Sequence, residues 1–125
     1  MLLFREKESE NRIAINVGGK SFTVIMYDNE AADELISRLP LTIEMNELNG
    51  NEKYYNFQNS FTTHSKPAGR IHNGDIKVYG DNCLVLFYDS FISGYSYTPI
   101  GYINDTAGLA EALGIGNVTV SFSLE

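Results

Sequence analysis

Short runs in which apolar and polar side chains alternate recur along the whole chain, and they constrain its fold more than any other feature of the sequence. Residues 13–17 have the two-residue period of a half-buried strand. Gly18-Gly19 then predicts a hairpin turn, and residues 22–26 continue the alternation. Residues 83–88 are nearly all apolar, as expected of a strand that is buried on both faces. We predict eight strands in all, at residues 13–17, 22–26, 41–45, 52–57, 75–79, 83–88, 98–103 and 118–122.

Two short segments have the pattern of helices instead. Residues 31–38 carry one apolar stripe, with Asp28 or Asn29 as the N-cap. Residues 107–113 carry a second, with Asp105 or Thr106 as the N-cap. Two such helices are too short to cover a wide sheet, but they can close the ends of a small barrel. The sequence therefore predicts a mainly β fold, a closed eight-stranded β-barrel with two short helices capping its ends.

The chain has the size of one domain, with 125 residues and no internal repeat or linker. We predict a single domain over residues 1–125, in which residues 1–11 form a loose N-terminal tail. Asn49-Gly50 predicts a further hairpin turn, because both of its residues adopt positive φ readily. Residues 58–73 are polar and include Pro67 and Gly69, which predicts a long irregular loop that could carry function.

Charge and composition exclude several classes of partner. The net charge is −7, so nucleic acid and anionic membranes are not expected to bind. No Lys or Arg follows Lys77. We interpret this acidic region as a solvated face, and a site for a cationic ligand is the alternative. No apolar run has the length of a membrane span or of a signal-peptide core, so we expect a cytoplasmic location. The single cysteine, Cys83, excludes an internal disulfide and is expected to be a small buried side chain.

Several strings of residues resemble the cyclophilins. The segments 22–26 and 29–35 resemble the cyclophilin strand that leads into the first helix, and 100–103 and 108–113 resemble a late strand and the second helix. The stretch from Ile13 to Phe122 is more specifically similar to a bacterial family of small cyclophilin-like proteins whose role is uncharacterised. The strings that carry this second resemblance are Asn49-Gly50-Asn51-Glu52-Lys53-Tyr54, Gly74-Asp75-Ile76-Lys77-Val78-Tyr79-Gly80, Asn82-Cys83-Leu84-Val85-Leu86-Phe87-Tyr88 and Tyr95-Ser96-Tyr97.

The resemblance implies a cyclophilin-like fold and a groove, but it weakens an isomerase function. Cyclophilins use an arginine in an aromatic groove to stabilise the twisted amide before proline. The corresponding residues 44–61 contain no arginine, and their only base is Lys53, which lacks the planar guanidinium. An aromatic residue of the buried strand is kept as Phe87, while the chain has no Trp. We therefore expect little or no prolyl isomerase activity.

Tyrosines dominate the candidate binding residues. Tyr95 and Tyr97 follow Gly94 in a predicted loop, and we expect both to be at least partly exposed above Phe87, whose ring should point into the barrel end. Tyr79 and Tyr102 fall in strands, where we favour a role in the core. The candidate groove residues are Tyr54, Tyr55, Phe57, Phe87, Tyr95 and Tyr97.

No catalytic residue, metal or cofactor is expected. His64 and His72 flank a loop and have no spacing typical of metal ligands. Three functions stay open. The first is a binding module for an extended peptide or small apolar ligand, the second is a weak prolyl isomerase that uses Lys53 or backbone donors, and the third is a protein that self-associates through the Tyr-rich strand edge. The sequence leaves the oligomeric state open.

Overall fold

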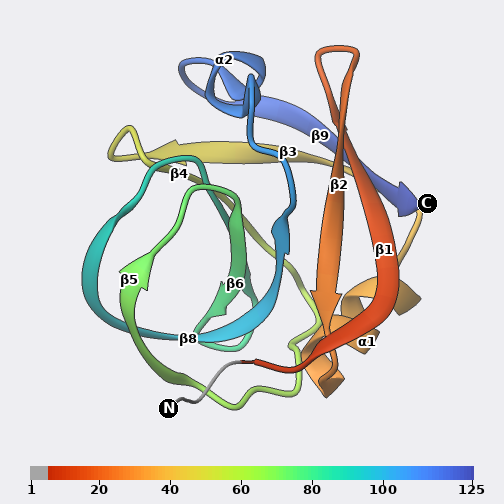
Figure 1. The fold of residues 1–125 in the computed structure, drawn as a ribbon, viewed down its shortest axis with the longest axis vertical. Coiled ribbons are helices and arrows are strands. Elements are labelled where there is room, and N and C mark those ends of the chain that lie inside the picture. The colour runs from red at the N-terminus through yellow and green to blue at the C-terminus, as the bar shows by residue number, and fades with distance from the viewer. Residues whose placement is uncertain (1–5) are drawn as a thin grey trace.

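The computed structural model describes residues 6–125, which form a mainly β structure around one antiparallel sheet of nine strands (Figure 1). Its strands run in the order β2-β1-β9-β3-β4-β7-β6-β8-β5. Strand β2 also pairs with β8, so the path of pairings through eight strands returns to its start, and β5 lies outside that path. The elements are β1 (Glu8–Val17), β2 (Lys20–Tyr27), α1 (Glu30–Ser37), β3 (Leu41–Leu48), β4 (Glu52–Asn56), β5 (Lys66–Ile71), β6 (Asp75–Tyr79), β7 (Cys83–Phe87), β8 (Phe91–Ile103), α2 (Leu109–Leu113) and β9 (Val118–Leu124).

The two hairpin turns predicted from glycine pairs are present. Gly18 and Gly19 join β1 to β2 with φ of 57° and 79°. Asn49 and Gly50 join β3 to β4 with φ of 57° and 69°. Positive φ at both central residues matches the right-handed twist of paired strands, which is why such turns fix the register of a hairpin.

The main core fills the space inside the ring of strands. Alternate strand residues such as Ile13, Leu84 and Leu86 point into it, together with Leu35 of α1 and Leu109 of α2. The two helices lie at opposite ends of the molecule in Figure 1.

The first predicted helix cap is correct and the second is not. The side chain of Asn29 caps α1, because its Oδ1 accepts a hydrogen bond from the amide of Ala32 at 2.8 Å. In α2 the cap position is occupied by Gly108, whereas Asp105 or Thr106 was expected there. A glycine supplies no side-chain acceptor, so α2 begins without a side-chain cap.

Two segments that we predicted to be irregular are strands in the structure. Residues 66–71, expected in a loop, form β5, and β8 begins at Phe91 rather than at residue 98. Strand β5 pairs only with β8, so it is an edge strand, where Pro67 is tolerated because its missing N–H removes no bond from a central ladder. Gly69 follows at a shift in register. Pro67 and Gly69 interrupt the alternation of apolar and polar residues by which a strand is recognised in a sequence.

The predicted N-terminal tail is wrong for residues 8–11. Residues 8–11 belong to β1, and a register shift against β2 between Glu8 and Arg12 explains why the apolar alternation starts only at Ile13. The rest of the predicted tail falls partly on residues 1–5, which lie outside the described residues.

A second, smaller core lies on the opposite face of β7. Leu84 and Leu86 point into the main core, whereas Val85 and Phe87 point away from it and pack with Ile71 and Tyr97. Strand β7 is therefore buried on both faces, as its apolar sequence predicts. The expectation that the Phe87 ring points into the barrel end is wrong, because β5 and residues 91–97 of β8 form a two-stranded ribbon that covers this outer face. We call the cluster that contains Val85 and Phe87 the second core, to distinguish it from the main core inside the ring of strands.

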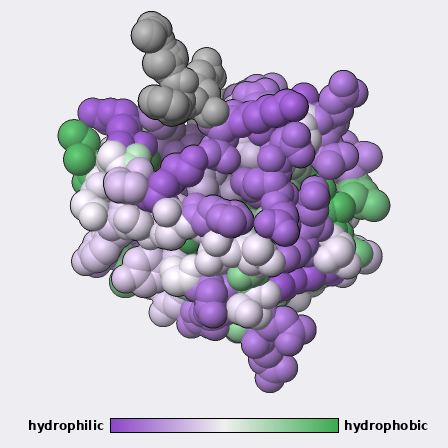
Figure 2. All heavy atoms as spheres, turned by 90° about the horizontal axis from the view of Figure 1, so that it is seen from below, coloured by the Kyte–Doolittle hydropathy of each residue, from purple (hydrophilic) through white to green (hydrophobic). Residues whose placement is uncertain are grey.

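The face in Figure 2 is dominated by hydrophilic side chains, with apolar ones confined to small patches. No helix within residues 6–125 is long and apolar enough to cross a membrane. Among the described residues, the large apolar side chains that are exposed are Leu48, Tyr79, Ile92, Tyr95, Ile115 and Leu124.

Candidate functional site

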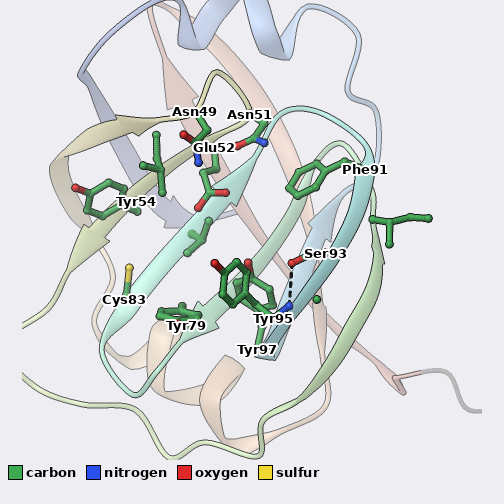
Figure 3. Close-up of a pocket in the computed structure, with 14 residues that line it drawn as sticks. Asn49, Asn51, Glu52, Tyr54, Tyr79, Cys83, Phe91, Ser93, Tyr95 and Tyr97 are labelled. Atoms are coloured by element: carbon green, nitrogen blue, oxygen red, sulfur yellow. Dashed lines mark hydrogen bonds between the residues drawn. The ribbon is translucent and has the colours of Figure 1, made fainter.

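A pocket of about 460 Å³ opens beside the second core, and we call it the tyrosine pocket (Figure 3). Three parts of the chain line it: the β3–β4 hairpin, the β6–β7 hairpin and the first half of β8. In Figure 3 the labelled side chains of Tyr79, Tyr95 and Tyr97 gather at one end, while Asn51 and Glu52 lie toward the other. The lining residues are Leu48, Asn49, Asn51, Glu52, Tyr54, Tyr79, Cys83, Val85, Phe91, Ile92, Ser93, Gly94, Tyr95 and Tyr97.

Three tyrosine rings form the aromatic end of the pocket. Tyr95 and Tyr97 are two residues apart on one strand, so they share a face, and both contact Tyr79 with ring centroids at 5.9 and 5.7 Å. Tyr95 is 63% exposed and Tyr79 is 47% exposed. Tyr79 therefore lines the pocket instead of the core, contrary to our expectation. Tyr102, also expected in the core, lies outside this pocket and donates a hydrogen bond to Glu8 at 2.7 Å.

The expectation that Tyr97 is exposed is wrong. Its relative exposure is 5%, because its ring packs edge-on against Phe87 at 5.6 Å. Burial raises the pKa of the Tyr97 hydroxyl. Phe87 also contacts Phe91 at 5.8 Å and is itself fully buried. Phe87 thus lies beneath the pocket and supports two of its lining rings without reaching the pocket surface.

The polar end of the pocket contains one carboxylate. Glu52 has no hydrogen bond or ion pair from its side chain to any part of residues 6–125, and it is the one acid among the lining residues. Burial, and then the nearby charge of Glu47, raise the pKa of Glu52. The neighbouring Asn51 Oδ1 is also buried and lacks a hydrogen-bond donor within the described chain. No Lys, Arg or His belongs to the lining, so the pocket has no protein cation.

Lys53 lies behind this end of the pocket and is fully buried. Its Nζ donates to Glu47 Oε1 at 2.7 Å, to the carbonyl of Gly114 at 2.8 Å and to the carbonyl of Gly116 at 2.5 Å. An ammonium group has three donors, so all of them are used within the protein. Lys53 is therefore not available to a ligand, so of the two kinds of donor in the isomerase alternative, Lys53 and the backbone, only the backbone is left.

The partner of Lys53 is held as an anion by several donors. Tyr88 Oη donates to Glu47 Oε1 at 2.6 Å, and the amide of Gly50 donates to Oε2 at 2.7 Å. Burial alone disfavours the charge on Glu47, but the hydrogen bonds from Lys53, Tyr88 and Gly50 outweigh it and lower the pKa of Glu47. Burial and the bond to Glu47 raise the pKa of Tyr88 to about 12. Lys53 and Glu47 thus attach the β3–β4 turn to the segment that follows α2.

The structure brings only some of the predicted groove residues together. Tyr54, Tyr95 and Tyr97 line the pocket, and Phe87 lies beneath it. Tyr55 and Phe57 lie elsewhere and pack against the main core. Side chains alternate along β4, so Tyr54 and Tyr55 point to opposite faces of the sheet.

Phe57 belongs to a different aromatic contact, outside the pocket. Its ring meets Phe61 at 5.5 Å, and the guanidinium of Arg38 lies 3.8 Å from the centroid of Phe61 and 4.9 Å from that of Phe57. Arg38 also donates to the carbonyls of Asn59 and Ser60. These bonds fix the segment between β4 and β5, so we assign Arg38 a structural role.

The remaining reactive side chains do not form a metal site within residues 6–125. No three His, Cys, Asp or Glu side chains of this part of the chain lie close enough together to hold a metal ion. His64 and His72 lie near different carboxylates, those of Glu30 at 3.4 Å and Asp75 at 3.9 Å.

Cys83 lines the tyrosine pocket, where burial and then the charge of Glu52 raise the pKa of its thiol. A raised pKa keeps this sulfur in its unreactive, protonated form.

Comparison with known proteins identifies the family. The profile of the cyclophilin-like family matches residues 15–123, nearly the whole chain. This chain belongs to the cyclophilin-like family. A solved structure with a similar fold is that of the hypothetical protein AF2241 from Archaeoglobus fulgidus, determined in solution. It is similar over 99% of this chain and 100% of its own, with a TM-score of 0.68 and 20% sequence identity, a level that supports a common fold alone. No curated protein matches the chain.

Proposed function

We propose that this cyclophilin-like domain is a binding module that holds a small ligand in the tyrosine pocket without turnover. The observation that carries the proposal is the pocket itself, whose volume of about 460 Å³ falls in the range of small-molecule sites. Four of the six exposed large apolar side chains of the described chain belong to its lining: Leu48, Tyr79, Ile92 and Tyr95. Apolar side chains concentrated around one concavity are typical of a ligand site.

A small ligand suits the site better than an extended peptide. One way to bind a peptide is to add it as a strand to a free sheet edge, and β5 is the edge strand of this sheet. Lys66 and Pro67 lie on that edge, and a charge and a proline both disfavour strand addition.

We further propose that the eight-strand ring is a closed barrel, supported by the pairing of β2 with β8. In that arrangement the pocket lies on the outer face of the barrel wall.

The absence of turnover is supported by the lining. A prolyl isomerase needs a donor that stabilises the twisted amide, and arginine supplies it in the cyclophilins that this chain resembles. The tyrosine pocket has no basic lining residue, and Lys53 makes three hydrogen bonds within the protein.

Titration by two-dimensional NMR tests the binding function. The probes are p-cresol, neutral 3,3-dimethylbutan-1-ol and cationic choline, each raised to about 50 mM because such small probes reach only millimolar affinity. We expect shifts confined to the lining, and at least a fivefold loss of affinity in Tyr95→Ala. Ile115→Ala, which removes a fully exposed side chain outside the pocket, should bind as the wild type does. The proposal is wrong if no probe shifts the lining residues.

The same apolar lining favours a second candidate function, self-association. A second copy could cover Tyr79, Ile92 and Tyr95, which are 47%, 74% and 63% exposed. Light scattering after size exclusion tests it: a dimer that becomes monomeric in Tyr95→Ala supports this function, and a monomer at all concentrations rejects it.

A further inference from the structure

We infer that the ligand of the tyrosine pocket carries a small organic ammonium group, which Glu52 and the tyrosine rings select together. This inference rests on the binding function proposed above and specifies the charge of the ligand. Neither the family nor the related solved structure indicates a charge for any ligand.

The first argument is the unpaired carboxylate. Glu52 is partly buried, and none of residues 6–125 gives its side chain a hydrogen bond or an ion pair. A partly desolvated carboxylate without a partner is unfavourable, and a ligand cation beside it removes that penalty.

The second argument is the arrangement of the rings. The faces of aromatic rings are electronegative and attract cations, and quaternary ammonium groups bind in cages of several such rings. The Tyr79 ring lies at 86° to that of Tyr95 and at 59° to that of Tyr97. Tyr97 is almost fully buried, but Tyr79 and Tyr95 are 47% and 63% exposed, so these two rings keep surface that a ligand cation can meet.

The third argument is the balance of charge near the pocket. The other nearby carboxylate, Glu47, is already compensated by Lys53. Glu52 is thus left as the uncompensated charge of the lining, which contains no base. An anionic ligand would be repelled there, and a neutral ligand would displace water from Glu52 without replacing its interactions. A ligand cation supplies the charge that Glu52 lacks.

Choline and 3,3-dimethylbutan-1-ol provide a matched pair of probes, because they have the same shape and differ in the charge. In NMR titrations at fixed ionic strength we expect choline to bind at least fivefold more tightly than the neutral alcohol. Glu52→Gln should remove this preference while leaving the affinity for the alcohol unchanged. Glu44→Gln, an exposed residue of β3 outside the lining, is the matched control for the loss of one negative charge, and it should keep the preference.

The titrations can reject the ammonium inference and the binding function separately. If the alcohol binds in the pocket as tightly as choline, the ammonium inference is wrong and the binding function stands. If Glu44→Gln weakens choline as much as Glu52→Gln does, the attraction comes from the acidic surface in general and the inference is also wrong. If neither probe nor p-cresol shifts the lining, the binding function itself is rejected.

Discussion

Replacing Lys53 by methionine removes a buried charge while keeping most of the volume of the side chain. The variant leaves three acceptors without their donor: Glu47 Oε1 and the carbonyls of Gly114 and Gly116. Breaking a buried ion pair by removing one partner destabilises a protein by about 3–5 kcal/mol.

The expected loss lies at the lower end of that range. The Glu47 side chain is 22% exposed and keeps its donors Tyr88 and Gly50, so water and these groups still solvate part of its charge. We therefore expect Lys53→Met to lower the free energy of unfolding by about 3 kcal/mol. This is a large part of the 5–15 kcal/mol, roughly, that stabilises a domain, and it lowers the ratio of folded to unfolded protein by about 150-fold.

Urea denaturation followed by far-ultraviolet circular dichroism measures this loss. The matched control is Lys20→Met, because Lys20 is an exposed lysine whose replacement should leave the free energy of unfolding nearly unchanged. Adding Glu47→Gln to Lys53→Met should restore part of the stability, since it removes the charge left without its partner. A loss below about 1 kcal/mol in Lys53→Met would refute the conclusion that its three hydrogen bonds hold the hairpin in place.

Three other predictions follow from the site. Phe87→Ala should destabilise the fold by about 3–5 kcal/mol in urea denaturation, whereas Tyr95→Ala should have little effect; equal losses would mean that Tyr95 is part of the core. A coupled protease assay should show little or no acceleration of proline cis/trans exchange, and an enhancement comparable with a working cyclophilin would reject binding without turnover. Burial raises the pKa of Glu52 above its ordinary 4.5 in the folded protein. The free energy that Glu52 contributes to stability is therefore full below pH 4.5, and it is lost as the pH rises through the raised pKa. Glu52→Gln should lack this decline and be at least as stable at neutral pH, as urea denaturation at several pH values will show.

The strands of the main core were predictable because two signals agree there. Alternating apolar residues and turn pairs such as Asn49-Gly50 report on local backbone geometry, which the sequence carries directly. Strand β5 lacked both signals: its side chains are mostly exposed, and Pro67 and Gly69 interrupt it. An edge strand of this kind is defined by its pairing with β8, a distant segment, so no local pattern reveals it.

The sequence indicated which types of residue line the pocket, but not on which face of the sheet each residue lies. Tyr54 and Tyr55 are adjacent and chemically identical, and only the pairing of Tyr54 with Val85 places Tyr54 on the side of the second core. The role of Lys53 was beyond prediction for a related reason. Two of its acceptors are carbonyls 61 and 63 residues away, and a backbone carbonyl leaves no mark in a sequence.

The two sides of the tyrosine pocket are supported differently, and this has a consequence for evolutionary change. The β3–β4 turn is held from behind by the buried Lys53, so substitution of Lys53 disturbs the fold. The opposite side is a ribbon outside the main core, where Ile92 and Tyr95 are 74% and 63% exposed. Mutations at these two positions can alter what binds while leaving the stability of the domain nearly intact. Substitution of Ile92 or Tyr95 can therefore change the ligand that the domain binds without loss of the fold.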